Sequence, residues 1–454
     1  MAEALKVCVV GHTNTGKTSF VRTLLQNTSF GEVSDRPSTT RDVRRAELKL
    51  GDEVVLEIFD TPGLEDGLGL YEYLQSLQAD QDMSRHNGPE QIRVFLKTPA
   101  AKEDFEQEAK VLRQLLQVDA AFYLIDCRDP VLPKYQDELD ILRRCGKPIL
   151  PVLNFTAHAD QQSAAWQQAL AQVNLHGWIE FDTVSLPEHG DSEIFQHLAT
   201  LLPNHRTHLQ TIQQQRQLQA QQRVVAARRE ISELLLDVAA YSERIANDEL
   251  DQLNHITAAM EQRVVAREQR SVTAILQIFG FPANAATLQR LAVGQQAWQA
   301  PLFAPETLKE FGIKASKGIV TGGAAGAGFD LMVGGLSLGA GTIIGAAAGG
   351  LWQSWQQYGR RIKHAVQGHS EIHIQPEIIR LLAARQQQLV QALMRRGHAA
   401  ITPLSLVNEN AEFHEPARFK LFLARARAHP QWSTLNQEKF DDSLERSQCL
   451  RLLD

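Results

Sequence analysis

Residues 11–18 read Gly-His-Thr-Asn-Thr-Gly-Lys-Thr and fit the phosphate-binding pattern G-x-x-x-x-G-K-[S/T] at every fixed position. A glycine at each end lets the backbone approach phosphate oxygens, where consecutive N–H groups form an anion nest. Lys17 supplies a point charge for the outer phosphates, and Thr18 offers a hydroxyl to Mg²⁺. The spacing therefore predicts a loop that binds a nucleotide. Its predicted contact residues are Gly11, His12, Thr13, Asn14, Thr15, Gly16, Lys17, Thr18 and Ser19.

The sequence on either side supplies the elements that such a loop requires. Leu5–Val10 is a short apolar run rich in β-branched residues, which predicts a buried strand. Ser19–Leu25 begins a helix, and the N-terminus of that helix would face the phosphates. A strand before the loop and a helix after it favour phosphate binding over a chance glycine-rich turn.

Two polar segments follow in the order that a nucleotide switch needs. Pro37–Asp42 lies after the first helix, and a threonine there can close over the γ-phosphate and its Mg²⁺. Val54–Phe59 predicts a strand that ends at an Asp-Thr-Pro-Gly tetrapeptide. We expect Asp60 of this tetrapeptide to lie beside Mg²⁺ and the N–H of Gly63 to sense the γ-phosphate.

The chain resembles a bacterial P-loop GTPase of the TrmE–Era-type branch in three segments, which are Gly11–Thr18, Thr39–Asp42 and Asp60–Leu64. The resemblance implies an α/β domain with a doubly wound, mostly parallel sheet. It implies GTP and GDP as ligands and hydrolysis of GTP as the activity. It also makes Thr40 the switch I ligand of Mg²⁺.

Hydrolysis needs other groups to position water and stabilise charge, because Leu64 stands where Ras-like enzymes place a glutamine that positions water. In TrmE-like members an asparagine of the loop helps to bind K⁺, which acts like an arginine finger. Asn14 matches that position; the alternative is a turn residue that tolerates left-handed geometry. Those members also use an acidic residue after switch II to position water. Glu72 matches best by spacing, with Glu65 and Asp66 as alternatives, and a solvated carboxylate is the ordinary interpretation.

The base-reading end departs from the usual Asn-Lys-x-Asp pattern. Asn154 is present, but Phe155 replaces the lysine and Ala157 replaces the aspartate that accepts from guanine. Asp160 lies three residues too late, so the GTP assignment rests on the switch motifs. Ser185 is a candidate for the last base-contacting loop, although serine is also a common turn former. The chain resembles bacterial GTPase-like proteins that share this Asn-Phe-Thr variant and a C-terminal domain, along most of its length.

Length and composition place the chain among globular proteins with two or three domains. It has 454 residues, a formal net charge of −7, 43% hydrophobic and 22% charged residues, which does not suggest a dedicated nucleic-acid binder. Four scattered cysteines without metal spacing indicate reduced thiols. The N-terminal residues show no secretory or lipidation signal, so we expect a cytoplasmic protein.

Apolar strands alternate with helices through residues 1–203, which predicts that the nucleotide domain occupies this range. The expected strands are 5–10, 54–59, 120–126, 148–153 and a short one near 179–185. Residues of about 66–117 form an insertion on the switch side, with helical pieces at 71–77 and 104–116. This insertion is either a partner-sensing arm or a decorated loop.

Residues 204–311 form an amphipathic helical region, because apolar residues recur there at three- and four-residue steps. The part from 204 to 278 is a bundle face or a site of oligomerisation through a coiled coil. Residues 359–454 are expected to form further helices.

Glycine is concentrated in residues 312–358, and Asp330 is the only charged residue between Gly318 and Gly359. Small residues spaced by four predict a helical hairpin of the glycine-zipper type with its turn near Asp330. Aromatic and basic residues at its end suit a membrane boundary, so contact with the inner membrane is one hypothesis. The other is a hairpin packed inside a helical domain.

We expect in-line attack of water on the γ-phosphate, with charge neutralised by Lys17, by Mg²⁺ at Thr18 and Thr40, and by K⁺ at Asn14. Two other classes of function stay open. A nucleotide-gated interaction module would hydrolyse negligibly and act through a protein partner. RNA modification or ribosome assembly follows from analogy with the branch alone, because the sequence offers no basic groove.

Overall fold

A computed structural model provides the structure of the chain. It describes residues 4–26, 42–80, 87–186, 190–246, 253–282, 302–303, 307–308, 311, 313, 329–333, 336–337, 369–398, 417–436 and 440–453. Contacts divide the chain into two compact units. The first comprises Met1–Gln222 with Arg395–Ile401, and the second comprises Arg223–Met394 with Thr402–Asp454. The boundary that we expect at residue 203 stays a prediction, as do the other boundaries.

The first unit is built on a six-stranded sheet in the order β2-β3-β1-β4-β5-β6. All neighbouring strands are parallel except β2, which forms an antiparallel pair with β3. The expected α/β domain with a mostly parallel sheet is therefore confirmed. The strands are β1 (Leu5–Val10), β2 (Arg44–Leu50), β3 (Glu53–Asp60), β4 (Ala120–Asp126), β5 (Ile149–Asn154) and β6 (Ile179–Glu180).

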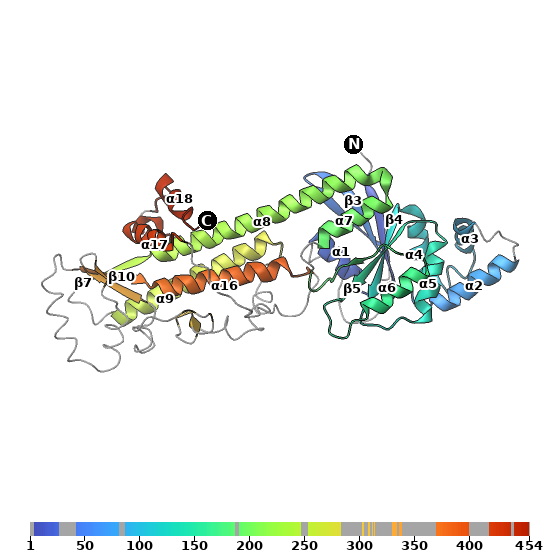
Figure 1. Cartoon of the computed structure of the whole chain (residues 1–454), viewed down its shortest axis with the longest axis horizontal. Coiled ribbons are helices and arrows are strands. Elements are labelled where there is room, and N and C mark those ends of the chain that lie inside the picture. The colour runs from blue at the N-terminus through green and yellow to red at the C-terminus, as the bar shows by residue number, and fades with distance from the viewer. Residues whose placement is uncertain are drawn as a thin grey trace. The chain divides into compact units, whose positions relative to one another are not determined.

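Helices cover both faces of this sheet (Figure 1). Apolar residues of α1, α7 and the beginning of α8 pack on one face, and those of α2 to α6 pack on the other. The helices are α1 (Lys17–Leu25), α2 (Gly67–Asp80), α3 (Gly88–Phe95), α4 (Glu106–Gln117), α5 (Pro133–Arg143), α6 (Ser163–Gln172), α7 (Gly190–Leu201), the 3₁₀ turn η1 (Pro203–His205) and α8 (Arg206–Ala240).

The segment interpreted as an insertion contains α2, α3 and α4, of which the sequence predicted the first and last. Tyr73, Phe95 and Phe105 form an aromatic cluster, with ring centroids 5.7–6.3 Å apart. Because these rings join the core beneath the sheet, α3 and α4 pack as part of the domain.

The second unit is mostly helical, as expected. Its core is formed by the later part of α8 and by α9, α16, α17 and α18. These elements are α9 (Leu253–Ile278), α16 (Pro376–Met394), α17 (Phe419–Ala428), the 3₁₀ turn η3 (Pro430–Trp432) and α18 (Leu444–Leu450). In the part of the chain that the structure describes, no helix is both long and apolar enough to cross a membrane.

A four-stranded antiparallel sheet in the second unit corrects three predictions of helical structure. Its order is β7-β10-β8-β9, from strands β7 (Ser242–Ala246), β8 (Phe329–Val333), β9 (Leu336–Ser337) and β10 (His369–Ile374). Asp330 lies within β8, opposite His373 of β10, so it is not the turn of a helical hairpin. The expectation of helix is also wrong at β10 within residues 359–454, and at β7 within residues 204–311. The rest of segment 312–358, apart from Ile313, β8 and β9, lies outside the described residues.

The physical reason lies in the residues around Asp330. Phe-Asp-Leu-Met-Val is a short apolar run between glycines, and such runs cannot be assigned to helix or strand by periodicity. Glycine on both sides disfavours continuation of a helix by about 1 kcal/mol per residue. Pairing with β10 supplies the backbone hydrogen bonds that the segment would otherwise lack.

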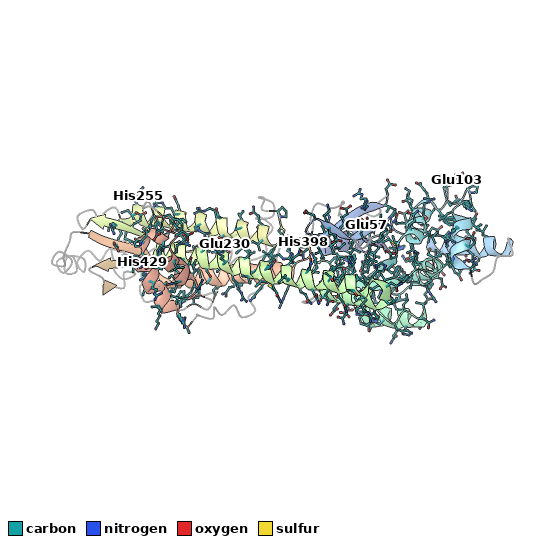
Figure 2. All side chains as sticks on the ribbon, turned by 90° about the horizontal axis from the view of Figure 1, so that it is seen from above. Glu57, Glu103, Glu230, His255, His398 and His429 are labelled. Atoms are coloured by element: carbon teal, nitrogen blue, oxygen red, sulfur yellow. The ribbon has the colours of Figure 1, made fainter. Side chains whose placement is uncertain are left out.

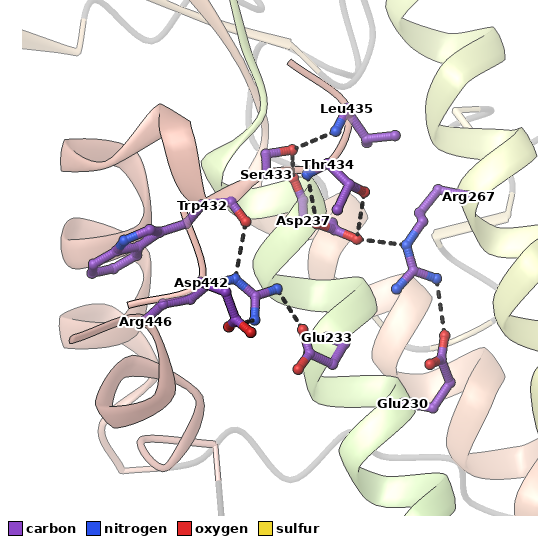
Figure 3. A network of polar contacts seen from close by, with 10 residues as sticks. All are labelled: Glu230, Glu233, Asp237, Arg267, Trp432, Ser433, Thr434, Leu435, Asp442 and Arg446. Carbon is purple, nitrogen blue, oxygen red and sulfur yellow. Dashed lines mark hydrogen bonds and ion pairs between the residues drawn. The ribbon is translucent and has the colours of Figure 1, made fainter. Parts of the chain in front are cut away.

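A buried polar network joins the C-terminal segment to α8 and α9 (Figure 3). Asp237 of α8 accepts from Arg267 Nε at 2.6 Å and from the Thr434 N–H at 2.9 Å. Arg446 donates to Glu233 of α8 and to the carbonyl of Trp432. Since Asp237 and Arg446 are buried, these contacts replace the water that each charge loses on folding.

Candidate nucleotide-binding site

The loop between β1 and α1 has the backbone geometry that phosphate binding requires. Gly11 has φ 142° and Gly16 has φ 89°, and residues that carry a Cβ rarely adopt such positive values. A Cβ at Gly11 would lie 2.5 Å from the carbonyl oxygen of Leu124. Asn14 is exposed with φ 67°, so it occupies the left-handed conformation that asparagine tolerates.

Lys17 is buried at the start of α1, with its ammonium held inside the loop. Its Nζ donates to the carbonyl oxygens of Gly11 at 3.1 Å and His12 at 2.7 Å. Burial lowers the pKa of Lys17 to about 8, although the negative charges of Asp60, Glu138 and Glu65 act in the opposite direction. A phosphate bound at this position would favour the charged form again.

The lowered pKa of Lys17 predicts a pH dependence of nucleotide affinity. Below pH 8 the free protein carries the ammonium, and above pH 8 it loses the charge that attracts phosphates. We expect affinity for GTP to be about tenfold lower at pH 9 than at pH 7, with proton uptake on binding above pH 8. Calorimetry in two buffers of different ionisation enthalpy measures both. Affinity that stays constant from pH 7 to pH 9 would contradict the assignment of Lys17 to the phosphates.

Thr18 and Asp60 meet beneath the loop in an arrangement that fits Mg²⁺. The Thr18 hydroxyl donates to Asp60 Oδ2 at 2.6 Å, and burial raises the pKa of Asp60. Among the described residues, the other oxygen, Asp60 Oδ1, is buried and has no hydrogen-bond partner. A buried carboxylate oxygen without a donor, next to a hydroxyl, suits a hard cation. Thr40 lies outside the described residues.

Leu64, which stands where Ras-like enzymes place a glutamine, is packed in the protein interior. It is fully buried, and its N–H donates to the carbonyl of Gly11 at 3.2 Å. Gly63, the residue before it, lies against Thr13, where an added Cβ would come within 2.7 Å of the Thr13 Cα. The beginning of switch II is thereby packed directly on the phosphate loop.

The acidic residues after Leu64 have different surroundings. Glu108 of α4 accepts from the N–H groups of Glu65 and Asp66, each at 2.9 Å, and is itself buried. Asp66 Oδ1 accepts from the Gly69 N–H at 2.8 Å at the beginning of α2. Glu72 lies exposed on α2. The role of Glu72, Glu65 or Asp66 in positioning water stays a prediction.

The same helix, α4, reaches switch I. Lys110 Nζ lies 3.0 Å from Asp42 Oδ1 and 3.0 Å from Glu106 Oε1. Since the Asp42 side chain is 81% exposed, this ion pair contributes little to stability by itself. Lys110 contacts Asp42 of switch I, and Glu108 contacts the beginning of switch II. Helix α4, which belongs to the segment interpreted as an insertion, therefore contacts both switch segments.

A contact between the phosphate loop and a buried carboxylate was not predicted from the sequence. His12 Nδ1 lies 2.7 Å from Glu138 Oε1, and Glu138 also accepts from the Tyr123 hydroxyl at 3.1 Å. Lys134 Nζ lies 3.0 Å from His12 Nε2, so hydrogen bonding favours the tautomer with its proton on Nδ1. Glu138 is fully buried. Its separation from His12 by 126 residues left no local signal in the sequence.

Asn154 joins the base-side loops to the phosphate loop. Its Nδ2 donates to the carbonyl of Thr15 at 2.9 Å. Its Oδ1 accepts from the N–H of Thr183 at 3.0 Å and from its hydroxyl at 3.1 Å. Phe155 has φ 58° and its ring packs against Gly16, while the Arg128 guanidinium lies 3.9 Å above the ring centre. The base-side loops are thus fixed by Asn154 even though the lysine of the usual pattern is absent.

Asp182 is a second residue that the sequence did not single out. Its carboxylate accepts from the N–H groups of Ala157 at 3.0 Å, Val184 at 2.9 Å and Ser185 at 3.0 Å. It is buried, so these three bonds stabilise the charge. The Ser185 N–H is therefore directed to Asp182. Whether Ser185 contacts the base stays a prediction.

Two family models match different parts of the chain. A model described as a 50S ribosome-binding GTPase matches residues 6–155. A model described as a domain of unknown function (DUF3482) matches residues 167–454. The first match contains the phosphate loop, both switch segments and Asn154.

Curated GTPases match part of the chain. The tRNA modification GTPase MnmE of Mycoplasmoides gallisepticum is 22% identical over 189 residues, which are 39% of this chain and 41% of that protein. GTPase Der of Azorhizobium caulinodans is 30% identical over 148 residues, which are 33% of this chain and 25% of that protein. The chain therefore spans less than half the length of these relatives. A crystal structure of Aquifex aeolicus Era bound to GDP.AlF4⁻ is 14% identical with a TM-score of 0.29, covering 40% of this chain and 52% of that chain.

Proposed function

We propose that this chain, which belongs to the DUF3482 family and carries a TrmE–Era-type P-loop GTPase domain, binds guanine nucleotides with Mg²⁺ and hydrolyses GTP. The observation that carries the proposal is the group formed by Lys17, Thr18 and Asp60 at the carboxyl ends of β1 and β3. A buried ammonium and a buried hydroxyl–carboxylate pair meet there beneath the phosphate loop, in which Gly11, Asn14 and Gly16 have positive φ.

Each residue has a role that follows from its position. The N–H groups of the loop and the start of α1 hold the phosphate oxygens, and Lys17 adds positive charge at the outer phosphates. Thr18 and Asp60 would hold Mg²⁺, with Thr40 from switch I. Bound Mg²⁺ supplies charge neutralisation as the γ-phosphate leaves. Gly63, which packs on Thr13, would respond to the γ-phosphate through its N–H.

We propose that K⁺ at Asn14 replaces the missing arginine finger and glutamine. Two observations support this. Leu64 is buried and apolar where a glutamine would act, and Asn14 is exposed at the turn of the loop with φ 67°. A cation beside the outer phosphates would stabilise charge that develops during attack by water.

A non-hydrolysing, nucleotide-gated module is the second candidate, because Leu64 stands where Ras-like enzymes place the glutamine that orients water. Phosphate release separates the candidates. GTPase activity predicts sustained release in K⁺ and Mg²⁺. A nucleotide-gated module predicts tight binding of GTP with no more than one phosphate released per protein over hours.

We also propose that the nucleotide state acts on the C-terminal region and on its contact with a membrane surface through segment 312–358. The support is compositional: one charged residue between Gly318 and Gly359, with Trp352, Trp355 and Tyr358 near the basic end. Exposing such a segment to water would be costly unless something covers it.

Flotation with liposomes of an anionic lipid mixture tests this proposal. We expect the intact chain to float, to an extent that differs between GTP and GDP, and a variant lacking residues 338–352 to stay in the dense fractions. The variant should bind nucleotide like the intact chain, which serves as its control for folding. Failure of the intact chain to float with any nucleotide would rule out the membrane surface as the partner of this segment.

A further inference from the structure

A short segment that follows α16 packs within the first unit. Residues 395–401 belong to the first unit by contacts, although the residues before and after them belong to the second. The described part of this segment runs from Arg395, which directly follows the last residue of α16, to His398, which is labelled in Figure 2. Its neighbour in the first unit is the loop 183–186 at the base-side edge of the sheet.

The two segments are joined through their backbones. The Leu186 N–H donates to the carbonyl of Arg395 at 2.8 Å, and the Gly397 N–H donates to the carbonyl of Val184 at 3.1 Å. Ser185 and Arg396 form an antiparallel bridge between these bonds. The segment therefore adds a short piece of strand to the loop, in addition to the hydrogen bonds that Asp182 accepts from it.

Gly397 is the point of closest approach. A Cβ built on this residue would lie 1.7 Å from the carbonyl oxygen of Thr183 and 2.6 Å from its carbonyl carbon. Both are backbone atoms, so no rotation of a side chain can relieve the overlap. Gly397 is buried, and any other residue there would push the segment and the loop apart.

The loop that Gly397 contacts is part of the nucleotide site. Thr183 donates to Asn154 Oδ1 through its N–H and its hydroxyl, and Asn154 Nδ2 donates to the carbonyl of Thr15 in the phosphate loop. A displacement of Thr183 would therefore reach the phosphate loop through one side chain, Asn154. The contacts of Lys17, Thr18 and Asp60 lie outside this path.

We propose that Gly397 is a positioning residue of the nucleotide site, and that segment 395–398 holds the base-side loop in its binding conformation. This inference rests on the proposed function, since it concerns the affinity for the same nucleotide. GTP and GDP share the base and ribose, so loosening this loop should weaken both by the same factor. The γ-phosphate end keeps its contacts, so the rate at saturating GTP should not change.

The variant Gly397→Ala tests the proposal, with Gly177→Ala as the matched control. Gly177 has open space around its Cα, and nothing lies within 4 Å of a Cβ there. For Gly397→Ala we expect the dissociation constants of GTP and GDP to rise together, by about tenfold or more, with kcat within twofold of the unaltered protein. Gly177→Ala should leave all three values unchanged. A purely structural glycine would lower the melting temperature and leave the dissociation constants alone, and that outcome overturns the proposal.

Hydrogen exchange of the unaltered chain keeps the inference testable if Gly397→Ala does not fold. We expect GDP and a non-hydrolysable GTP analogue to slow exchange equally at the amides of Leu186 and Gly397. No change at these amides on nucleotide binding, or a change with the GTP analogue alone, would overturn the inference. If the unaltered chain binds neither GTP nor GDP, the proposed function itself fails. If it binds both and Gly397→Ala binds them equally well, only this inference fails.

Discussion

Replacing Lys17 with alanine should lower the affinity for Mg²⁺ and GTP by at least 100-fold, which corresponds to about 2.7 kcal/mol. The Nζ of Lys17 is the one described ammonium within the loop, where it donates to the carbonyls of Gly11 and His12. In a buried site each charge-assisted bond to phosphate contributes more than it would at the surface. Alanine leaves the backbone nest in place but removes the charge, so residual binding by the N–H groups is expected.

Isothermal titration of GTP into both proteins measures the difference. Lys102→Ala, at an exposed position away from the loop, is the matched control and should bind like the unaltered chain. Lys17→Ala should keep its thermal stability or gain some, because a desolvated ammonium is removed. Unchanged affinity for GTP in a folded Lys17→Ala protein would mean that the nucleotide, if bound, lies elsewhere.

Turnover of GTP should be at least tenfold faster in K⁺ than in Na⁺ at equal ionic strength, and Asn14→Gly should remove this difference. Glycine is the informative substitution, because Asn14 has φ 67° and glycine keeps that backbone conformation while removing the amide. Loss of the cation response then reports the amide rather than strain in the loop. An arginine finger contributes about 10³-fold or more in related chemistry, so a tenfold response is a conservative expectation.

Asn174 offers the matched control, since it is exposed and left-handed with φ 57° in a loop away from the phosphates. Asn174→Gly should retain the full preference for K⁺. If Asn14→Gly hydrolyses GTP at the same rate as the unaltered chain in both salts, Asn14 is only a turn residue and K⁺ has no part in catalysis at this position.

The nucleotide domain could be predicted from sequence because its signals are local. The run Leu5–Val10 leads into the phosphate loop, and Val54–Phe59 leads into Asp60, the residue expected to lie beside Mg²⁺. In both cases the strand and the functional residues follow one another directly along the chain. Strand β2 was missed, since Arg44–Leu50 alternates charged and apolar residues at the edge of the sheet with only Ala46 and Leu48 buried. The short β6 also ends earlier than the expected strand near 179–185.

The residues that contact the site from distant parts of the chain could not be predicted in the same way. Glu138 lies 126 residues from His12, and Gly397 lies more than 200 residues from the loop that it contacts. A carboxylate in a helix or a glycine after a helix has many ordinary explanations, and only the fold shows which backbone it approaches. Asp330 illustrates the opposite error, because a regular spacing of glycines favoured a helical hairpin where pairing with β10 makes a strand.

Release of inorganic phosphate from GTP by the intact chain, followed over many turnovers in Mg²⁺ and K⁺, tests the central claim most directly. Lys17→Ala supplies the background rate, and EDTA supplies the rate without Mg²⁺. The account predicts sustained release that exceeds both, and that stops when EDTA is added. Tight binding of GTP with no release above the Lys17→Ala background would contradict it, and would leave a nucleotide-gated module as the function of this chain.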